Sequence, residues 1–296
     1  MVSILILGLV DAAVVGLAAV GLTLQFGVTN YLNFGYTEWI TFSALVAYTF
    51  NASLGHVNIW LALAIAAVFS AGLAVIINRL VFARFARRSR DPFTVLIVTF
   101  MVGFLMNQTY LLIWGGNSLE LKGGSASASI FSIGSQQVSL YQVISILVAI
   151  GCMLILEAFL HFTRVGRSMR AVSDNQGLAV ACGLNTSLVT DIAWAISGLF
   201  GGIAGVVLAI QVHAFTIGLG NGYLYLIYPA VVIGGIGSPS GGLVAGLLVG
   251  VVAALGSLYV PAEVSIAVIF AVMVAIVMLR PSGLLGTGRH PSMLEA

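Results

Sequence analysis

Long apolar segments recur along the whole chain and constrain its fold more than any other feature. About 20 consecutive apolar residues suffice to cross a bilayer as a helix, and segments of this kind follow one another up to Arg280. Hydrophobic residues make up 60% of the 296 residues and charged residues 7%, whereas a soluble domain carries about 25% charged residues. The segments are too long and too uniformly apolar for barrel strands, so we expect an all-α polytopic membrane protein.

The apolar runs and the turn residues between them delimit nine candidate spans. They cover residues 4–26, 32–52, 57–82, 93–114, 140–162, 188–212, 223–237, 240–260 and 263–280. The last ends at Arg280-Pro281, because proline disfavours helical geometry in the residue before it. The segment 223–237 is short and runs into GGIGSPSGG, a pattern also typical of a broken or re-entrant helix. We therefore expect one transmembrane domain over 1–296 with roughly eight or nine spans.

Basic residues cluster in three places along the chain. Five lie between Arg79 and Arg90, three between Arg164 and Arg170, and two in the tail at Arg280 and Arg289. Lys and Arg accumulate in short cytoplasmic loops, so these regions are expected inside and the lone Lys122 outside. Residues 27–56 carry no Lys or Arg. The side of the N-terminus therefore depends on the number of spans, and nine spans would place it outside.

The N-terminus and the two cysteines add further expectations. The first apolar run lacks a basic start and continues to about Phe26, which favours a retained span over a cleaved signal peptide. Cys152 lies in an apolar segment and Cys182 in a basic loop, and neither has a histidine nearby in a metal-binding pattern. We expect neither a disulfide nor a metal site.

The polar passage TRVGRSMRAVSDNQGLAVACGLNTS, residues 163–187, lies between two apolar spans and is expected to be a cytoplasmic loop. Ser173 and Gln176 have the spacing of a capping box, and Asp174 would lie in a first helical turn. Gly183 stands where a helix C-terminus requires a positive φ. The spacing predicts a helix over 174–182, which is too short to be stable alone and needs a partner to pack against.

Nucleotide binding is not encoded in this chain. Its only lysine, Lys122, is not in a GxxxxGK[ST] context. If transport is driven by ATP, a separate ATPase with Mg²⁺ must supply the energy, and it needs a docking element. The candidate docking residues are Arg167, Arg170, Ser173, Asp174, Gln176, Leu178, Ala181 and Gly183. The alternative is a surface loop that happens to be helical.

Three motifs together resemble one family. The 163–187 passage, GGIGSPSGG at 234–242 and RPSGLLG at 280–286 look like the permease subunits of ATP-binding-cassette (ABC) importers for branched-chain amino acids. The stretch GLAAVGLTLQFGVTNYLNFGYTEWITFSALVAY at 16–48 resembles the family's opening, and the likeness covers nearly the whole chain. One departure is Tyr36, where the family commonly has a histidine in an Asn-Phe-Ala-His-Gly-Glu-like run. That departure concerns the substrate more than the architecture.

The resemblance implies a type II-like ABC importer permease fold without catalytic activity or a cofactor of its own. It implies a heterodimer with a second homologous permease, two cytoplasmic ATPase subunits that use ATP and Mg²⁺, and a periplasmic binding protein that delivers substrate. It also implies a bacterial inner-membrane location and a coupling helix at 174–182. Nonpolar amino acids are the substrates that it implies, and urea or another small solute is the alternative.

Ionisable and polar residues inside spans are candidates for the translocation path, because each is costly to insert in a bilayer. Asn33 and Glu38 lie in the second span, and Gln211 and His213 end a span on the expected outer side. A structural hydrogen bond is as good an explanation for Glu38 as a path role. Asp191 is expected at the membrane interface, near a helix start.

Glycines at four-residue spacing predict close helix packing, because small residues let helix backbones approach in lipid. The candidates are Gly198, Gly202, Gly205, Gly242, Gly246 and Gly250. Packing within this chain is the simpler reading, and a subunit interface or a contact along the substrate path is the alternative.

Two other functional classes predict features that this sequence shows only weakly or lacks. A secondary transporter or channel predicts inverted repeats, and AAVGLTLQFG at 18–27 bears only a vague likeness to AGVVLAIQVH at 204–213. An intramembrane enzyme is disfavoured, because the chain has no HExxH motif and few histidines.

Overall fold

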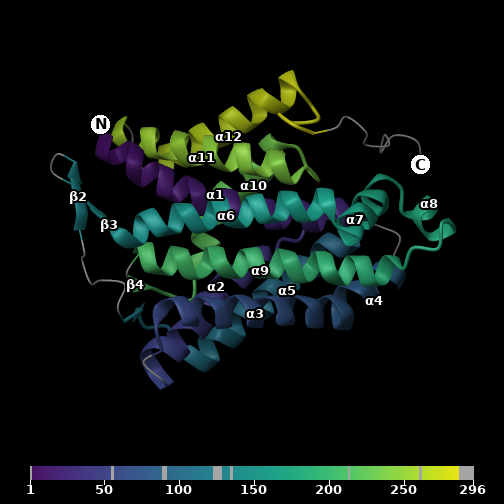
Figure 1. The fold of residues 1–296 in the computed structure, drawn as a ribbon, viewed down its shortest axis with the longest axis horizontal. Coiled ribbons are helices and arrows are strands. Elements are labelled where there is room, and N and C mark those ends of the chain that lie inside the picture. The colour runs from purple at the N-terminus through teal and green to yellow at the C-terminus, as the bar shows by residue number, and fades with distance from the viewer. Residues whose placement is uncertain are drawn as a thin grey trace.

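The fold is a bundle of long helices, as Figure 1 shows. The computed structural model describes residues 2–54, 57–88, 92–122, 129–133, 136–212, 214–259 and 262–286. Most of these residues are helical, which confirms the all-α membrane fold. Among the described residues, six helices are long and apolar enough to cross a membrane, and the helical segments over 219–234 and 264–279 are shorter and apolar.

The elements before residue 140 form the first half of the molecule. They are α1 (Val2–Thr29), α2 (Tyr36–Tyr48), the π-helix η1 (Thr49–Leu54), α3 (Ile59–Ile77), the π-helix η2 (Asn78–Phe82), α4 (Ala83–Arg88), α5 (Pro92–Trp114) and the strands β1 (Leu119–Glu120), β2 (Ser129–Ile133) and β3 (Gln136–Ser139). The remaining elements are α6 (Leu140–Phe162), α7 (Arg164–Asp174), α8 (Gln176–Ala181), α9 (Thr186–Val212), β4 (Ala214–Phe215), α10 (Leu219–Gly234), α11 (Pro239–Tyr259) and α12 (Ala262–Leu279). Two small antiparallel sheets, β1 with β4 and β2 with β3, lie at the end of the bundle opposite α8.

Every expected span corresponds to a helix, with shifted boundaries for two of them. The second span begins at Tyr36 rather than at residue 32, because Asn30 to Gly35 form an irregular connection in which Asn30 has a φ of 59°. The seventh begins at Leu219 rather than at 223 and runs through Pro229 without a break before it ends at Gly234. The short segment is thus one continuous helix of 16 residues.

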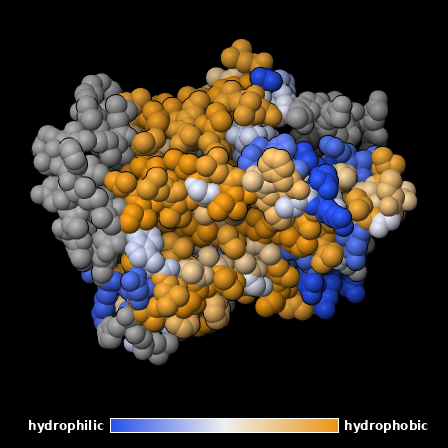
Figure 2. Space-filling view, in the orientation of Figure 1, coloured by the Kyte–Doolittle hydropathy of each residue, from blue (hydrophilic) through white to orange (hydrophobic). Residues whose placement is uncertain are grey.

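Helices α1 and α9 form the centre of the bundle. In an apolar stretch of 18 residues, 83% of the residues of α1 and 78% of those of α9 are buried within the chain. The corresponding fractions are 22% for α5 and 28% for α6. Figure 2 shows the consequence, an apolar surface over the sides of the bundle, with hydrophilic residues gathered at its ends. Since lipid is as apolar as leucine, the outer helices satisfy the bilayer while α1 and α9 hold the polar interior.

The two halves of the chain are arranged in opposite senses around this centre. The end of α1 lies at α7, because Gly27 is next to Ser173, whereas α9 starts at that end, directly after α8. Helix α1 packs along α11 and α9 packs along α3, and in both pairs the helices run antiparallel. The segments 18–27 and 204–212, whose likeness in sequence is vague, therefore lie in corresponding parts of α1 and α9. An inverted arrangement does not by itself separate a secondary transporter from this family.

Small residues line these central pairs. Gly246 packs against the backbone of Gly16, and Gly205 packs against the carbonyl of Ile40, so that a side chain at either position would collide with backbone. The same closeness to a neighbouring helix of this chain is found at Gly198, Gly202, Gly242 and Gly250. Close backbone approach replaces the hydrophobic driving force that lipid does not provide.

The two glycine-rich motifs near the C-terminus meet. The Leu284 N–H donates to the Ile233 carbonyl (2.8 Å) and the Leu285 N–H to the Gly234 carbonyl (3.1 Å). Gly235 and Gly283 adopt φ values of 100° and 76° and lie against one another. The segment after α12 thus closes over the connection between α10 and α11.

Candidate coupling and translocation sites

Helix α7 is an amphipathic helix docked on the end of α6. The Thr163 hydroxyl caps it by accepting a hydrogen bond from the Gly166 N–H (2.9 Å). Gly166 has no room for a side chain, because the backbone of α6 at Phe159 and Leu160 lies against it. Met169 and Val172 are buried on the same side. The arginines of α7 are exposed, which leaves a basic outer face.

Helix α8 follows after one residue, and its cap differs from the expected one. Asn175 leaves helical geometry (φ −160°, ψ 103°), and its side-chain oxygen accepts from the Leu178 N–H (2.9 Å). Ser173 and Asp174 belong to the last turn of α7, so the predicted capping box with Gln176 is wrong. Asparagine is as good an N-cap as serine, and Asn175 lies two residues closer than Ser173 to Leu178, whose N–H needs a partner.

The C-terminus of α8 forms as the sequence predicts. Gly183 has a φ of +81°, its N–H donates to the Val180 carbonyl (2.9 Å), and the Leu184 N–H donates to the Ala179 carbonyl (3.0 Å). This pair of bonds is the Schellman motif. The helix itself runs from Gln176 to Ala181, with Cys182 as its C-cap.

The outer face of α8 is apolar and exposed. The exposed fraction is 63% for Leu178 and 55% for Val180, whereas Ala179 is buried at 4%. Ala181 and Cys182 are exposed too. In Figure 1, α8 projects from the end of the molecule beyond α7. Sequence reasoning named Leu178 and Ala181 and missed Val180, which is exposed on the other side of the buried Ala179.

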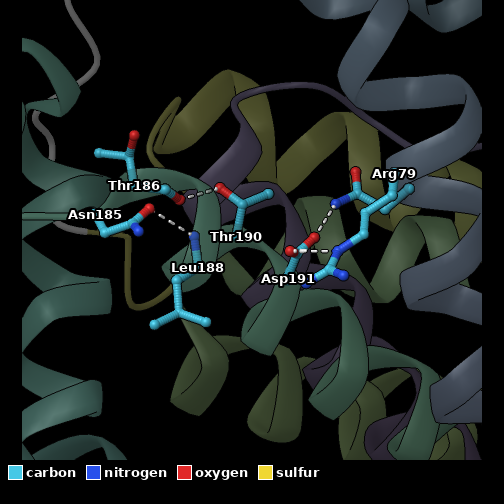
Figure 3. Close-up of polar contacts among 7 residues, drawn as sticks. Arg79, Asn185, Thr186, Leu188, Thr190 and Asp191 are labelled. Carbon is cyan, nitrogen blue, oxygen red and sulfur yellow. Dashed lines mark hydrogen bonds and ion pairs between the residues drawn. The ribbon is translucent and has the colours of Figure 1, made fainter.

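The start of α9 is tied to η2, which follows α3 directly, by a polar cluster that is drawn in Figure 3. Asp191 and Asn78 are buried in it, and Arg79 is exposed. Asp191 accepts from the Asn78 side-chain amide (2.9 Å) and from Arg79 Nε (2.8 Å). Asp191 is buried within the chain, and it lies near the start of α9, as the sequence predicted. Just before α9, Asn185 caps the helix by accepting from the Leu188 N–H (3.1 Å). The cluster links the beginning of α9 to η2.

A second polar cluster lies within the membrane-spanning part, toward the end opposite α8. Glu38, in the first turn of α2, is buried, and the Asn107 side-chain amide of α5 lies 3.4 Å from both of its carboxylate oxygens. Asn107 also donates to the Ile217 carbonyl (3.2 Å). The Thr37 hydroxyl contacts the Asn221 side chain of α10 (3.4 Å). The start of a helix favours a carboxylate, which suits Glu38 at this position.

Asn33 belongs to a different network. Its side-chain oxygen accepts from the Gly35 N–H (3.0 Å), and its carbonyl accepts from the Tyr228 hydroxyl (2.7 Å). Its side-chain amide reaches Gln25 (3.5 Å), whose Oε1 also accepts from Ser197 (3.2 Å). These contacts close the irregular connection between α1 and α2 against α9 and α10.

The predicted path residues are thus spread over several places. Asn33 and Glu38 lie in separate clusters, Gln211 is half-buried in the last turn of α9, and His213 lies outside the described residues. Asn107 and Asn221 were missed. The sequence signal for Asn107 was an uncharged polar residue within an apolar span, because such a residue, like a charged one, is costly to place in a bilayer.

Metal ligands are not grouped in the part of the chain that the structure describes, where three or more His, Cys, Asp or Glu side chains never come together. Cys152 and Cys182 are free thiols.

Comparison with known proteins assigns the chain. The family model described as "Branched-chain amino acid transport system / permease component" matches residues 4–277, which include α8, the Asp191 cluster and the Glu38 cluster. The chain belongs to this permease family. It is accordingly a multi-pass membrane transport subunit and not an enzyme.

One named relative matches most of this permease, and two others match about half of it. It is 27% identical over 291 residues to the high-affinity branched-chain amino acid transport system permease protein LivH of Salmonella typhimurium, covering 91% of this chain and 90% of the relative. It is 31% identical over 157 residues to LivH of Escherichia coli K12 (51% and 49% covered) and 28% identical over 155 residues to BraD of Pseudomonas aeruginosa (52% and 50%). No solved structure matches the chain.

Proposed function

We propose that this permease is the membrane-spanning subunit of an ABC importer for branched-chain or other nonpolar amino acids. The observation that carries the proposal is α8, a short helix capped at both ends that presents Leu178 and Val180 to solvent. An exposed apolar face at the rim of a membrane protein is suited to a protein partner. Relatives named for branched-chain amino acid transport support the substrate class.

In this proposal ATP and Mg²⁺ are used by two cytoplasmic ATPase subunits, and this chain holds no cofactor. A second homologous permease completes the path, and a binding protein on the outer side delivers the amino acid in the bacterial inner membrane. The basic residues of α7 and α4 favour the cytoplasmic side for the end that carries α8.

The coupling step follows from how α8 is connected. An ATPase that moves α8 pulls on α9 through the connection over 182–185, and the Asn185 cap keeps the first turn of α9 intact during the movement. Asp191 transmits the displacement to Asn78 and Arg79 at the end of α3. Because α9 is packed along both α1 and α3, it moves the centre of the bundle rather than one outer helix.

The polar cluster at Glu38 is the proposed contact point for substrate along the path. The cluster joins α2, α5 and the segment that precedes α10. It lies toward the end of the bundle opposite the proposed ATPase site. Buried amide and carboxylate groups offer partners to a zwitterionic amino acid, and the surrounding apolar side chains suit a nonpolar side chain.

Co-purification of the complex tests the docking role of α8. The Leu178→Asp variant is expected to retain about tenfold less ATPase than the wild type, because a charge replaces an apolar contact at the proposed interface. Phe85→Asp is the control, since Phe85 is also exposed, on α4 at the same end of the molecule. Equal ATPase retention by Leu178→Asp and wild type would refute docking on α8.

Uptake by the reconstituted complex tests the rest of the proposal. Leucine uptake is expected to require ATP inside the proteoliposomes and all subunits. Uptake by this chain alone, without ATPase, would identify a secondary transporter or channel instead. Preferential uptake of urea over leucine would replace the substrate class and leave the coupling mechanism in place.

A further inference from the structure

A deep apolar groove runs along the outside of the bundle between α1, α6 and α11. Its volume is about 440 Å³, within the range of ligand pockets. Leu9 and Ala13 of α1, Ile150 and Leu154 of α6, and Val244 and Leu247 of α11 line it. All three helices are among those long enough to cross a membrane, so the groove lies at the depth of the acyl chains.

The groove continues into a polar hollow at the end that carries α7. The hollow has a volume of about 330 Å³ and shares Glu157, Pro239 and Ser240 with the groove. The other charged or titratable side chains that line it are His161 of α6 and Arg170 and Asp174 of α7. Figure 2 shows hydrophilic residues gathered at this end and apolar residues along the bundle.

The side chains of the hollow are linked along one edge. His161 Nε2 lies 3.0 Å from Glu157 Oε1, and Arg170 Nη1 lies 3.4 Å from His161 Nδ1. Glu157, His161 and Arg170 are nevertheless exposed, so their remaining hydrogen-bonding capacity faces the hollow and its mouth. The result is a mixed-charge site at the water-facing end of an apolar groove.

We propose that the groove and the hollow together bind one phospholipid of the cytoplasmic leaflet with a zwitterionic, primary-amine head group. An acyl chain lies between α6 and α11, the phosphate is bound by Arg170, and the ammonium group is bound by Asp174. The order of the parts matches such a lipid, whose apolar chain leads to a phosphate and then to an amine.

Charge decides which head group fits. The hollow has one arginine against two carboxylates, so a purely anionic head group would meet excess negative charge. A head group that carries both a phosphate and an ammonium satisfies both signs. The groove alone would accept the chain of any lipid, and the selectivity therefore resides in the hollow.

The hollow lies next to the base of α8, so a lipid bound there would affect how α8 is held. Met169, Arg170, Ser173 and Asp174 form the α7 side of the hollow, and α8 follows directly after Asn175. A bound head group would bridge α7 to α6, and the segment over 237–240 would close the site from the α11 side. Occupancy would therefore brace the base of α8.

Native mass spectrometry of the full-length chain, stripped of lipid and titrated with defined phospholipids, tests the proposal. Phosphatidylethanolamine is expected to bind about tenfold more tightly than phosphatidylglycerol. Arg170→Gln is expected to weaken phosphatidylethanolamine binding about tenfold through the lost phosphate contact. Val244→Trp, which fills the groove, should weaken both lipids, whereas Val68→Trp on the exposed side of α3 should weaken neither.

Three results would overturn the site. The first is equal binding of the two lipids by the wild type, and the second is unchanged binding by both Arg170→Gln and Val244→Trp. The third is loss of the second permease from the Val244→Trp complex with lipid binding unaltered, which would assign the groove to a subunit interface. Arg170 is exposed, so its variant reports on binding even if the groove variant fails to fold.

Discussion

The elbow formed by α7 and α8 and the cluster around Glu38 are both polar regions of an apolar chain, but they are held together differently. At the elbow, the caps of Thr163 and Asn175 and the Gly183 turn join residues three to five positions apart. At the Glu38 cluster, the contact with Asn107 spans 69 residues and the contact between Thr37 and Asn221 spans 184.

The difference follows from the surroundings of the two regions. The elbow faces water, where unpaired backbone groups are solvated and a short helix needs only its caps. The cluster lies within the apolar bundle, where no water is at hand and polar groups must find partners on other helices. Variants in the two regions should therefore differ in whether they affect global stability or only local structure.

The largest effect is expected from Gly246→Leu in the pairing of α11 with α1. The new side chain would meet the backbone of Gly16, at an estimated cost of about 3 kcal/mol. Thermal unfolding in detergent should show a markedly lower Tm and aggregation. Gly72→Leu on α3 is the matched control, because that position has no neighbouring atom within 4 Å. Equal Tm values for the two variants would contradict the close pairing.

Asp191→Ala is expected to come next. It removes the acceptor that Asn78 and Arg79 share and leaves the buried Asn78 amide unsatisfied, which costs about 1–3 kcal/mol. Asp191→Asn retains an acceptor for Asn78 and should lose less. In the assembled complex, Asp191→Ala should also lower transport per ATP hydrolysed. Normal coupling in a folded Asp191→Ala complex would remove Asp191 from the coupling route.

Glu38→Gln separates charge from structure in the buried cluster. The amide retains an acceptor for Asn107, so the free energy of unfolding is expected to change by less than about 1 kcal/mol. Leucine uptake is expected to fall about tenfold if the carboxylate binds the substrate amine. Wild-type uptake by Glu38→Gln, at wild-type stability, would make Glu38 a purely structural residue.

The smallest and most local effect is expected from Asn175→Ala. Loss of an N-cap costs about 1 kcal/mol and should fray α8 alone, leaving the Tm of the bundle nearly unchanged. Hydrogen exchange of the Leu178 amide should rise, whereas Ser173→Ala should leave it unaltered. The opposite pattern would restore Ser173 as the cap.

Local features of the chain were predictable from its sequence. The nine apolar spans, the glycine-terminated helix before Leu184 and the close-packing glycines all depend on neighbouring residues or on a repeat of four. Bilayer thickness and backbone geometry dictate such features whatever the surrounding fold. The misassigned cap shows the limit of this reasoning, because Ser173 and Asn175 are both good caps and only the bend between α7 and α8 selects Asn175.

Other features required the tertiary structure. The burial of Asp191 beside Asn78 and Arg79, the contact of Glu38 with Asn107, and the closure of 233–237 by 282–286 depend on which helices are neighbours and how each is rotated. In a chain whose spans are nearly uniform in apolarity, hydrophobic periodicity does not specify that rotation, because lipid and protein interior are equally apolar. The sequence alone determined that the chain folds as a series of apolar helices and where the polar elbow lies. Only the packing of small residues in three dimensions decided which polar groups meet between the helices.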